Sequence, residues 1–387
     1  MSWLPSILLR PHSGALIVLG TSALGGAAYR YSSSSSSDAS LNPHSFTPYT
    51  LVHKQPVSST SAIFTLRNRE GGRDPESLKE GWKRSVWSVQ VKQPQLQIAR
   101  AYTPLPPLSQ TSPPSAAPES HNADGADDDA HASEDLRLLI RKEEGGEVST
   151  YLHTLAPQST VELRGPNTEC ELPHDIKEVI FLAGGTGIAP AMQVARALGQ
   201  RAGSRMWILW ANRRREECAG GVSDGDEGDG ETVRMLRLQP QSTWWRGLFW
   251  GRARGTETVP LHTQRQMQTL VGGHSSEAKG KGIIVQELES LKTRGTPHTR
   301  GLSISYYVDE ENHFISPGDV AKRLHVDAQS HHDHGEKGSK VILVSGPDGF
   351  IAHWAGKKLW VGGREVQGPL GGVLGQMDLG DWRVFKL

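Results

Sequence analysis

The sequence predicts two folded domains of different architecture, an antiparallel β-barrel of the α+β class followed by a doubly wound, parallel-sheet α/β domain, with a membrane anchor at the N-terminus. Three observations support this prediction. After Phe46, short stretches in which polar and apolar residues alternate follow one another, which is typical of antiparallel strands. After Pro173, apolar runs alternate with helical patterns, which is typical of a parallel sheet. Near the N-terminus, an uncharged segment from Gly14 to Tyr29 lies between Arg10 and Arg30.

The composition excludes several classes of protein and of site. The chain has 387 residues and a formal net charge of +0, so it has room for two cores and no basic surplus for nucleic acid. Its two cysteines, Cys170 and Cys218, are far apart and lie in unlike contexts. They can form neither a disulfide framework nor a thiolate metal site, so we expect no metal centre and no nucleic-acid partner.

Residues 1–45 differ in composition from the rest of the chain. Arg10 and His12 precede every acidic residue, which is typical of a targeting sequence. Because the uncharged segment is short for a bilayer, three interpretations stay open: a secretory signal that is cleaved near Ala27 and Ala28, a transit peptide, or a short transmembrane anchor. The anchor is favoured because its glycines suit a helix packed in lipid and a serine-rich linker follows it.

Residues 46–172 are predicted to form the barrel. The candidate strands are Tyr49 to Lys54, Ala62 to Leu66, Val86 to Val91, Gln97 to Tyr102 and Leu136 to Arg141. Between the last two of these, residues 106–134 are rich in proline, serine, alanine and aspartate. Such a composition cannot form a core, so we expect a disordered insert.

Residues 173–387 are predicted to form the parallel-sheet domain. The candidate strands are Glu178 to Ala183, Met206 to Ala211, Leu302 to Val308 and Lys340 to Val344, and helices are expected after Pro190, Pro317 and Asp348. Two inserts, residues 219–282 and 325–338, interrupt this domain and are expected to be surface loops. The second insert is rich in histidine.

A glycine-rich turn follows the first apolar run of this domain. The turn consists of Gly184, Gly185, Thr186 and Gly187. Pro190 then opens a helical pattern. Glycine lets the backbone approach an anion closely, and the N-terminus of the next helix supplies the counter-charge. The arrangement predicts a phosphate-binding turn, although such spacing taken alone is more often only a tight connection.

A second informative stretch ends a predicted barrel strand. It consists of Arg100, Tyr102 and Thr103, and the first two side chains share one face because they are two residues apart. A guanidinium can bind a phosphate while the neighbouring ring stacks on a flat heterocycle, and the threonine hydroxyl can hydrogen-bond a ring nitrogen.

Two further turns complete the set of candidate binding segments. The first consists of Gly145, Gly146, Val148 and Ser149, at the start of a helical pattern, and resembles an anion nest. The second consists of Ser345, Gly346 and Pro347, at the carboxyl end of the last long predicted strand. Ligands of doubly wound sheets bind at that edge.

The order of these four segments resembles that of the ferredoxin reductase and cytochrome b5 reductase superfamily, over roughly Phe46 to Leu387 apart from the inserts. The resemblance implies an enzyme that uses FAD and either NADH or NADPH. It implies that the flavin is bound by Arg100, Tyr102 and Thr103, and its pyrophosphate by Gly145, Gly146, Val148 and Ser149. It implies that the nicotinamide dinucleotide is bound by Gly184, Gly185, Thr186, Gly187, Pro190, Gly346 and Pro347, and that hydride transfer takes place beside Thr103, Thr186 and Ser345.

The two ends of the chain narrow the resemblance. The leader, the serine-rich linker and the C-terminal Gly380 to Leu387 are similar to those of fungal mitochondrial flavoproteins that assist cytochrome c import and haem attachment. This implies an inner-membrane protein whose flavin domain faces the intermembrane space. Haem, cytochrome c or the haem lyase would be its acceptor partners.

Two departures from the family pattern leave alternatives open. Ser345 stands where cytochrome b5 reductases usually carry a cysteine, which puts efficient hydride transfer in doubt. Arg213 to Glu217 includes both arginines, which suit a 2′-phosphate, and a carboxylate, Glu217, which suits a free 2′-hydroxyl, so the choice between NADH and NADPH stays open. The alternatives are an FAD-binding scaffold with little turnover and a cytochrome b5 reductase-like enzyme on another membrane.

Other patterns are set aside. Gly221 to Gly225 fits a nucleophile elbow but has no preceding strand. Histidines in the second insert, His325, His331, His332 and His334, are more simply a solvated loop than a metal site. Tryptophans and arginines in the first insert, around Trp244 to Arg254, either pack on their own domain or contact a membrane or partner.

Overall fold

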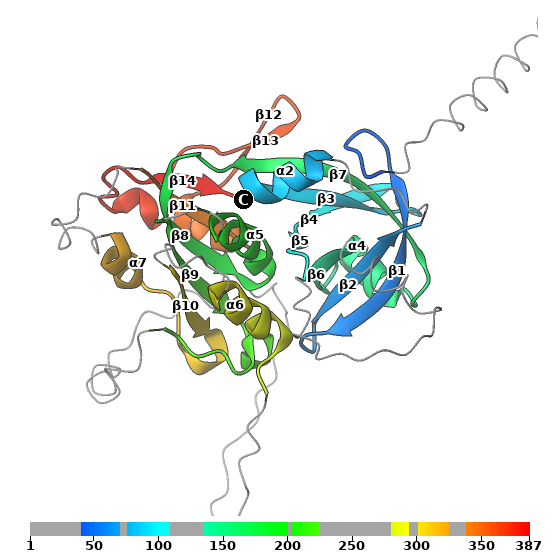
Figure 1. The fold of residues 1–387 in the computed structure, drawn as a ribbon, viewed down its shortest axis with the longest axis horizontal. Helices are drawn as coiled ribbons and strands as arrows, with labels where there is room; N and C mark the ends of the chain where they lie inside the picture. The colour runs from blue at the N-terminus through cyan, green and yellow to red at the C-terminus, as the bar shows by residue number, and fades with distance from the viewer. Residues whose placement is uncertain are drawn as a thin grey trace, which may run out of the picture.

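The computed structural model describes residues 40–69, 76–108, 135–199, 201, 203–224, 280–293, 301–324 and 338–387. Within these ranges the chain forms an antiparallel sheet and a parallel sheet, which lie on the right and on the left of Figure 1. This confirms the predicted two-sheet architecture. The predicted anchor, most of the insert at 106–134 and the histidine-rich and tryptophan-rich loops lie outside the described residues. None of the helices in the described ranges is both long and apolar enough to cross a membrane.

The antiparallel sheet has seven strands in the order β4-β3-β7-β1-β2-β6-β5, and each neighbouring pair is antiparallel. The strands are β1 (Thr47–Pro56), β2 (Ser61–Asn68), β3 (Ser85–Gln93), β4 (Ile98–Tyr102), β5 (Pro104–Leu105), β6 (Leu136–Arg141) and β7 (Thr160–Glu171). The two end strands, β4 and β5, are joined by Thr103 alone, so the sheet curls back on itself. Since the described residues show no ladder between β4 and β5, the barrel is not fully closed.

Five of these seven strands lie where the alternating pattern predicts them. The pattern missed β5, which is two residues long, and β7, which is twelve. Gly165 and Pro166 interrupt the sequence of β7, and such a dipeptide normally marks a turn. The partners of β7 on both sides, β1 and β3, keep it extended.

A separate core fills the antiparallel sheet. It includes the fully buried Trp87, Leu51 and Leu163. Helix α4 (Glu147–Thr154) adds Val148 and Leu152 to this core, while α2 (Glu76–Arg84) precedes β3.

The parallel sheet has the order β10-β9-β8-β11-β14, and every neighbouring pair is parallel. The strands are β8 (Ile176–Gly184), β9 (Arg205–Asn212), β10 (Gly301–Val308), β11 (Ser339–Ser345) and β14 (Arg383–Lys386). The first four were predicted. The chain runs outward in one direction from β8 to β10 and in the other from β11 to β14. The switch point between β8 and β11 is where doubly wound sheets bind ligands.

Helices cover both faces of the parallel sheet, as predicted for a doubly wound fold. Helices α5 (Ile188–Leu198) and α6 (Ile283–Thr293) bury apolar side chains on one face. On the opposite face lie α7 (Pro317–Leu324) and α8 (Asp348–Ala355). Helix α6 was not predicted, because it directly follows the irregular insert.

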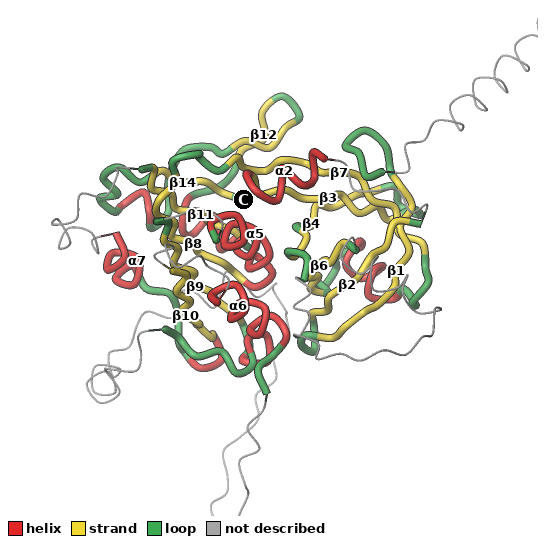
Figure 2. The backbone as a smooth tube through the Cα atoms, viewed as in Figure 1, coloured by secondary structure: helices red, strands yellow, loops and turns green. Residues whose placement is uncertain are grey.

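Short elements complete the fold. They are the 3₁₀ turns η1 (Gly185–Gly187), η2 (Arg215–Cys218), η4 (Asp309–Glu311) and η6 (Leu374–Gln376), and the hairpin of β12 (Leu359–Val361) and β13 (Arg364–Val366). The hairpin stands out from the rest of the molecule at the top of Figures 1 and 2.

Buried polar side chains join the two sheets. Gln193 of α5 donates to the carbonyl oxygens of Trp87 and Pro104, at 3.2 and 2.9 Å, and accepts from the Trp87 amide at 3.0 Å. Arg137 of β6 forms an ion pair with Glu287 of α6, with Nη1 3.3 Å from Oε2. Because buried polar groups of this kind require their partners, the contacts define how the sheets are placed relative to each other.

Candidate functional site

The glycine turn after β8 is closely packed. Gly184 ends the strand, and a Cβ at this position would lie 2.9 Å from the ring of Phe350. Gly185 has φ +54°, which favours glycine, and its carbonyl oxygen accepts a 2.9 Å hydrogen bond from the Trp210 indole. Thr186, half-buried, then leads into α5, where Pro190 is buried in the first turn. Proline is tolerated there because its missing N–H would have no partner within the helix.

The turn after β11 contacts the turn after β8. A Cβ on Gly187 would lie 2.4 Å from the carbonyl oxygen of Ser345. Gly346 has φ +151°, and a Cβ there would lie 3.0 Å from Cα of Gly184. Pro347 caps α8, accepting from the amides of Phe350 and Ile351. The structure therefore brings both predicted nicotinamide segments together at the switch point.

The predicted flavin strand lies at one end of the antiparallel sheet. Arg100 and Tyr102 of β4 pair with Val91 and Val89 of β3 and share one face, as expected. Arg100 is exposed and Tyr102 is half-buried. Burial raises the pKa of Tyr102 to about 12, with Arg100 lowering it and Glu143 raising it further. The tyrosine is therefore neutral at physiological pH and lies within electrostatic range of both charges.

Thr103 joins β4 to β5, and β5 contacts α5. Thr103 itself is half-buried. The next residue, Pro104, accepts the hydrogen bond from Gln193, which lies two turns into α5. A single buried amide side chain thus bonds α5 to β5, whose first residue follows Thr103 directly.

Ser149, in the first turn of α4, hydrogen-bonds the backbone of the segment that precedes this helix. Ser149 is buried, and its hydroxyl accepts from the amide of Glu143 at 3.1 Å and donates to the carbonyl of Gly146 at 3.2 Å. Gly145 has φ +74° with open space around it. Val148 packs in the core. The hydroxyl therefore shapes the turn that ends in Gly146, and the backbone of this turn is what lies at the N-terminus of α4.

Arg141 is a residue of this region that the sequence did not indicate. It ends β6, and its guanidinium is the nearest group to the position of a Cβ on Gly185, at 3.5 Å. It donates to Thr60 at 3.4 Å and forms an ion pair with Glu217 in η2. Burial, and secondarily Arg213, lowers the pKa of Arg141. No spacing pattern joins positions so far apart in the chain, so only the fold could reveal the contact.

The segment from Arg213 to Glu217, in which the sequence leaves the choice between NADH and NADPH open, bonds largely to other residues of the protein. Glu217 is buried, pairs with Arg141 and accepts from the Arg213 amide at 3.1 Å. Arg215 pairs with Glu311. Arg213 and Arg214 are exposed, and Arg214 donates to Ser59 at 3.1 Å. Of the two residue types weighed for this segment, the arginines Arg213 and Arg214 are exposed, Arg215 is half-buried in its ion pair, and the carboxylate of Glu217 is buried.

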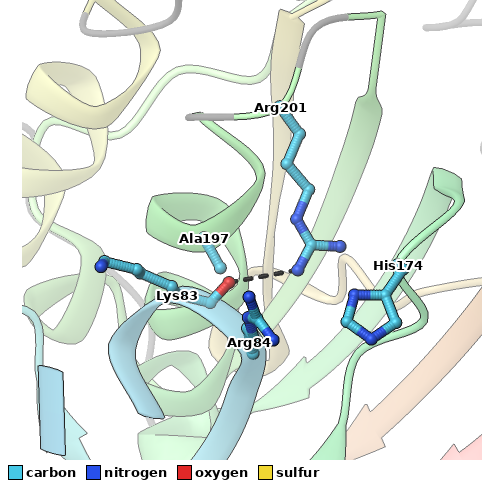
Figure 3. A pocket seen from close by; sticks show the side chains of 5 residues that line it. All are labelled: Lys83, Arg84, His174, Ala197 and Arg201. Atoms are coloured by element: carbon cyan, nitrogen blue, oxygen red, sulfur yellow. Dashed lines mark hydrogen bonds between the residues drawn. The ribbon is translucent and has the colours of Figure 1, made fainter. Parts of the chain in front are cut away.

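A basic pocket of about 250 Å³ lies away from these segments. It is lined by Lys83, Arg84, His174, Ala197 and Arg201 (Figure 3). Arg201 donates to the carbonyl oxygens of Pro173 at 2.7 Å and of Lys83 at 3.1 Å. The pocket adjoins the C-terminal end of α5, whereas the glycine turn is at its N-terminal end, so it includes none of the predicted site residues.

Ser223 and Asp224, from the pattern resembling a nucleophile elbow, have a structural role. The Ser223 hydroxyl accepts from the amide of Tyr306 at 2.9 Å, and Asp224 accepts from the amide of Ile304 at 2.8 Å. Both amides belong to the edge strand β10, so these side chains satisfy its exposed backbone.

Comparisons with known proteins point to the same site. The family model of the oxidoreductase NAD-binding domain matches residues 181–220. The chain is 31% identical over 150 residues to the cytochrome c mitochondrial import factor CYC2 of Saccharomyces cerevisiae, covering 38% of each chain. It is 28% identical to an FAD-binding protein of Schizosaccharomyces pombe, over 41% of this chain and 49% of that protein. It is also 28% identical to NADH-cytochrome b5 reductase 1 of Aspergillus terreus, over 44% of this chain and 50% of the reductase.

The chain spans half or less of the length of each of these relatives. The matched stretch nevertheless includes the end of β8, the glycine turn on one side of the switch point, α5 and β9. Over the matched stretches the chain is therefore similar to FAD- and NAD-binding reductases of the ferredoxin reductase type.

Proposed function

We propose that the chain is an FAD-dependent oxidoreductase of the cytochrome b5 reductase type, which takes hydride from NAD(P)H and passes electrons to a one-electron acceptor. One observation carries the proposal: the turns after β8 and β11 pack against each other, and Arg141 of β6 adjoins the first of them. In this proposal residues 46–172 bind the flavin and residues 173–387 bind the nicotinamide dinucleotide.

The turn residues fit a nicotinamide dinucleotide. Gly185 has a positive φ, and the guanidinium of Arg141 is the nearest group to the position of its Cβ, at 3.5 Å. Gly184, Gly187 and Gly346 bring the two backbone turns together, so that the start of α5 and the start of α8 adjoin the same edge. Backbone N–H groups and a helix dipole are suited to a pyrophosphate there.

The residues of the antiparallel sheet fit a flavin nucleotide. An exposed guanidinium on Arg100 suits a phosphate, and the half-buried ring of Tyr102 on the same face suits a flat heterocycle. The turn at Gly145 and Gly146 leads into α4, which contacts this strand. Val148 and Ser149 hold that turn in place.

The protein supplies position and electrostatics, whereas bound FAD would supply the conversion of a two-electron donor into one-electron steps. We assign Thr103 to the flavin side and Thr186 and Ser345 to the nicotinamide side. Pro190 and Pro347 set the direction of α5 and α8. Gln193 holds α5 against Pro104, beside Thr103, so the two sides keep a fixed separation.

Haem, cytochrome c or the haem lyase is the proposed acceptor partner, and the mitochondrial inner membrane the proposed location. The support is the relative from Saccharomyces cerevisiae, a cytochrome c mitochondrial import factor. In this proposal an N-terminal anchor within residues 1–39 holds the flavin domain in the intermembrane space. Import of a tagged chain into isolated mitochondria, followed by protease treatment and carbonate extraction, tests both parts of the assignment.

Anaerobic spectroscopy tests the enzyme assignment. We expect the purified protein to show a flavin band that bleaches within seconds after addition of NADH or NADPH, and addition of ferric haem should restore it. Arg100→Glu should lose flavin during purification, while Arg364→Glu, on an exposed hairpin elsewhere, should keep it. Full flavin content in Arg100→Glu would contradict the assignment of Arg100.

A scaffold that binds FAD with little turnover is the second candidate. It is favoured by Ser345, which is 7% exposed and has no thiol. Stopped-flow reduction separates the candidates, because a scaffold would leave the flavin band unchanged over many seconds. Ser345→Cys should accelerate reduction if the enzyme assignment holds, and should change nothing in a scaffold.

A further inference from the structure

The β12–β13 hairpin exposes a cluster of large apolar side chains. Its five members are Leu359 (45% exposed), Trp360 (74%), Val361 (60%), Val366 (40%) and Leu370 (47%). They account for five of the nine large apolar side chains that are exposed among the described residues. Several large apolar side chains exposed together on one short element and the residues that follow it mark a candidate interaction site.

The base of the hairpin is firmly built, so this exposure is not that of a loose loop. The buried ammonium of Lys386 donates to the carbonyl oxygens of Lys357 at 3.1 Å and Pro369 at 2.8 Å, one on each side of the hairpin. Gln367 bonds both the amide and the carbonyl of Lys386, at 2.7 and 2.8 Å. Gly368 has φ +62°, and a Cβ there would lie 2.8 Å from the Lys357 carbonyl.

Apolar side chains lie on both faces of the hairpin. Leu359 is paired with Val366, so these two side chains share one face. Trp360 is paired with Glu365 and points to the other face. A protein partner would cover one face and leave the other in water. A medium that surrounds the hairpin would cover both.

The charges around the cluster favour an anionic surface. Residues 357–370 carry Lys357, Lys358 and Arg364 against a single carboxylate, Glu365, which pairs with Lys358 at 3.2 Å. Three cations and one anion leave a net charge of +2. Tryptophan favours the membrane interface, and lysine and arginine favour anionic headgroups.

From this geometry we propose that the β12–β13 hairpin inserts into the headgroup region of an anionic lipid bilayer. Trp360, Leu359 and Val361 would enter the interface, and Lys357 and Arg364 would contact the headgroup phosphates. The docking is peripheral and does not depend on any segment outside the described residues. It is also independent of the proposed flavin chemistry.

A fluorophore on the hairpin tests the proposal in the full-length protein. Cys170 and Cys218 are buried, and burial raises the pKa of each thiol to about 11, so a new exposed cysteine is labelled selectively. Val361→Cys carries the environment-sensitive label. The matched control is Val222→Cys, another exposed valine, 69% exposed and on a different element.

Vesicles of phosphatidylcholine and phosphatidylglycerol in equal parts should shift the emission of the label at position 361 to the blue and leave position 222 unchanged. Vesicles of phosphatidylcholine alone should give a smaller shift. Trp360→Glu should raise the lipid concentration needed for half of the shift by about tenfold or more. Leu96→Glu, at a residue 55% exposed elsewhere, should not change it.

Two results would overturn the proposal. One is emission at position 361 that vesicles leave unchanged, or change as much as at position 222. The other is a blue shift that grows with protein concentration without lipid, since the hairpin would then bind a second copy of the chain.

Discussion

The glycine turn after β8 and the glycine turn before α4 look alike in sequence, yet different physical constraints require their glycines. At Gly184 and Gly187 a Cβ would collide with Phe350 and with the Ser345 backbone. At Gly145 a Cβ would meet nothing, but φ is +74°. Gly184 and Gly187 of the first turn are therefore limited by space, whereas Gly145 of the second turn is limited by its backbone conformation.

This difference indicates how each turn responds to change. In the first turn the obstacle is largely backbone of a neighbouring strand, which can move only if β8 and β11 separate. In the second turn a single side chain, Ser149, stabilises the local shape through its hydroxyl. Substitutions should therefore act through the core at one turn and through local structure at the other.

The largest effect is expected for Gly187→Ala. Its methyl would lie 2.4 Å from the Ser345 carbonyl oxygen. Because the backbone fixes the position of a Cβ, only a shift of the backbone could relieve this clash. We expect a loss of about 3 kcal/mol or more in the free energy of unfolding, or no folded protein. Urea unfolding measures it. Gly318→Ala, in helix α7 with no contact nearer than 3.6 Å, is the control and should be neutral or stabilising.

Gly184→Ala should cost less, because its obstacle is a side chain. The methyl would press on the Phe350 ring at 2.9 Å, and we expect a loss of about 1 to 3 kcal/mol. Phe350→Leu, which introduces a smaller side chain, should recover part of that loss when it is combined with Gly184→Ala. Additive losses in a double-mutant cycle would show that the two residues do not interact.

Ser149→Ala should loosen the second turn. The amide of Glu143 and the carbonyl of Gly146 would each lose a partner, and we expect a loss of about 1 kcal/mol or slightly more. Thr150→Ala, one residue along α4 and half-buried, is the matched control. Equal unfolding curves for the two variants would contradict a structural role for the Ser149 hydroxyl.

Gly145→Ala should have the smallest effect of the series. Only the cost of φ +74° applies, and we expect about 1 kcal/mol. Gly145→Asn should cost less than alanine, because asparagine tolerates the left-handed region. If alanine and asparagine were equally costly, a contact rather than the backbone conformation would be the cause.

Local patterns predicted much of the fold. The alternation of polar and apolar residues predicted β1 to β4 and β6, and the alternation of strands and helices predicted β8 to β11. In each of these segments the pattern of apolar residues follows from which side chains are buried. Strand β7 was missed because Gly165 and Pro166 are typical of a turn, and the β12–β13 hairpin because its strands of three residues each are too short to show a period.

The contacts between distant segments could not be predicted in this way. The turns after β8 and after β11 were visible in the sequence, but the contact between these two turns depends on the order β8-β11 in the sheet. The pairing of Arg141 with Glu217 joins β6 to η2, and that of Arg137 with Glu287 joins β6 to α6. A single sequence contains no signal for such pairs, because they arise from how the two sheets dock.

Gln193 gives helix α5 a mechanical role. The residue lies three positions after Pro190, about 5 Å along the helix axis, and is bonded to the backbone of both β3 and β5. A tilt at the N-terminal end of α5 would therefore strain three hydrogen bonds in the opposite sheet. The side chain that makes these bonds is an uncharged amide. Changes of salt or pH should therefore leave the bonds unaffected, while they act on ion pairs between the sheets such as that of Arg137 with Glu287.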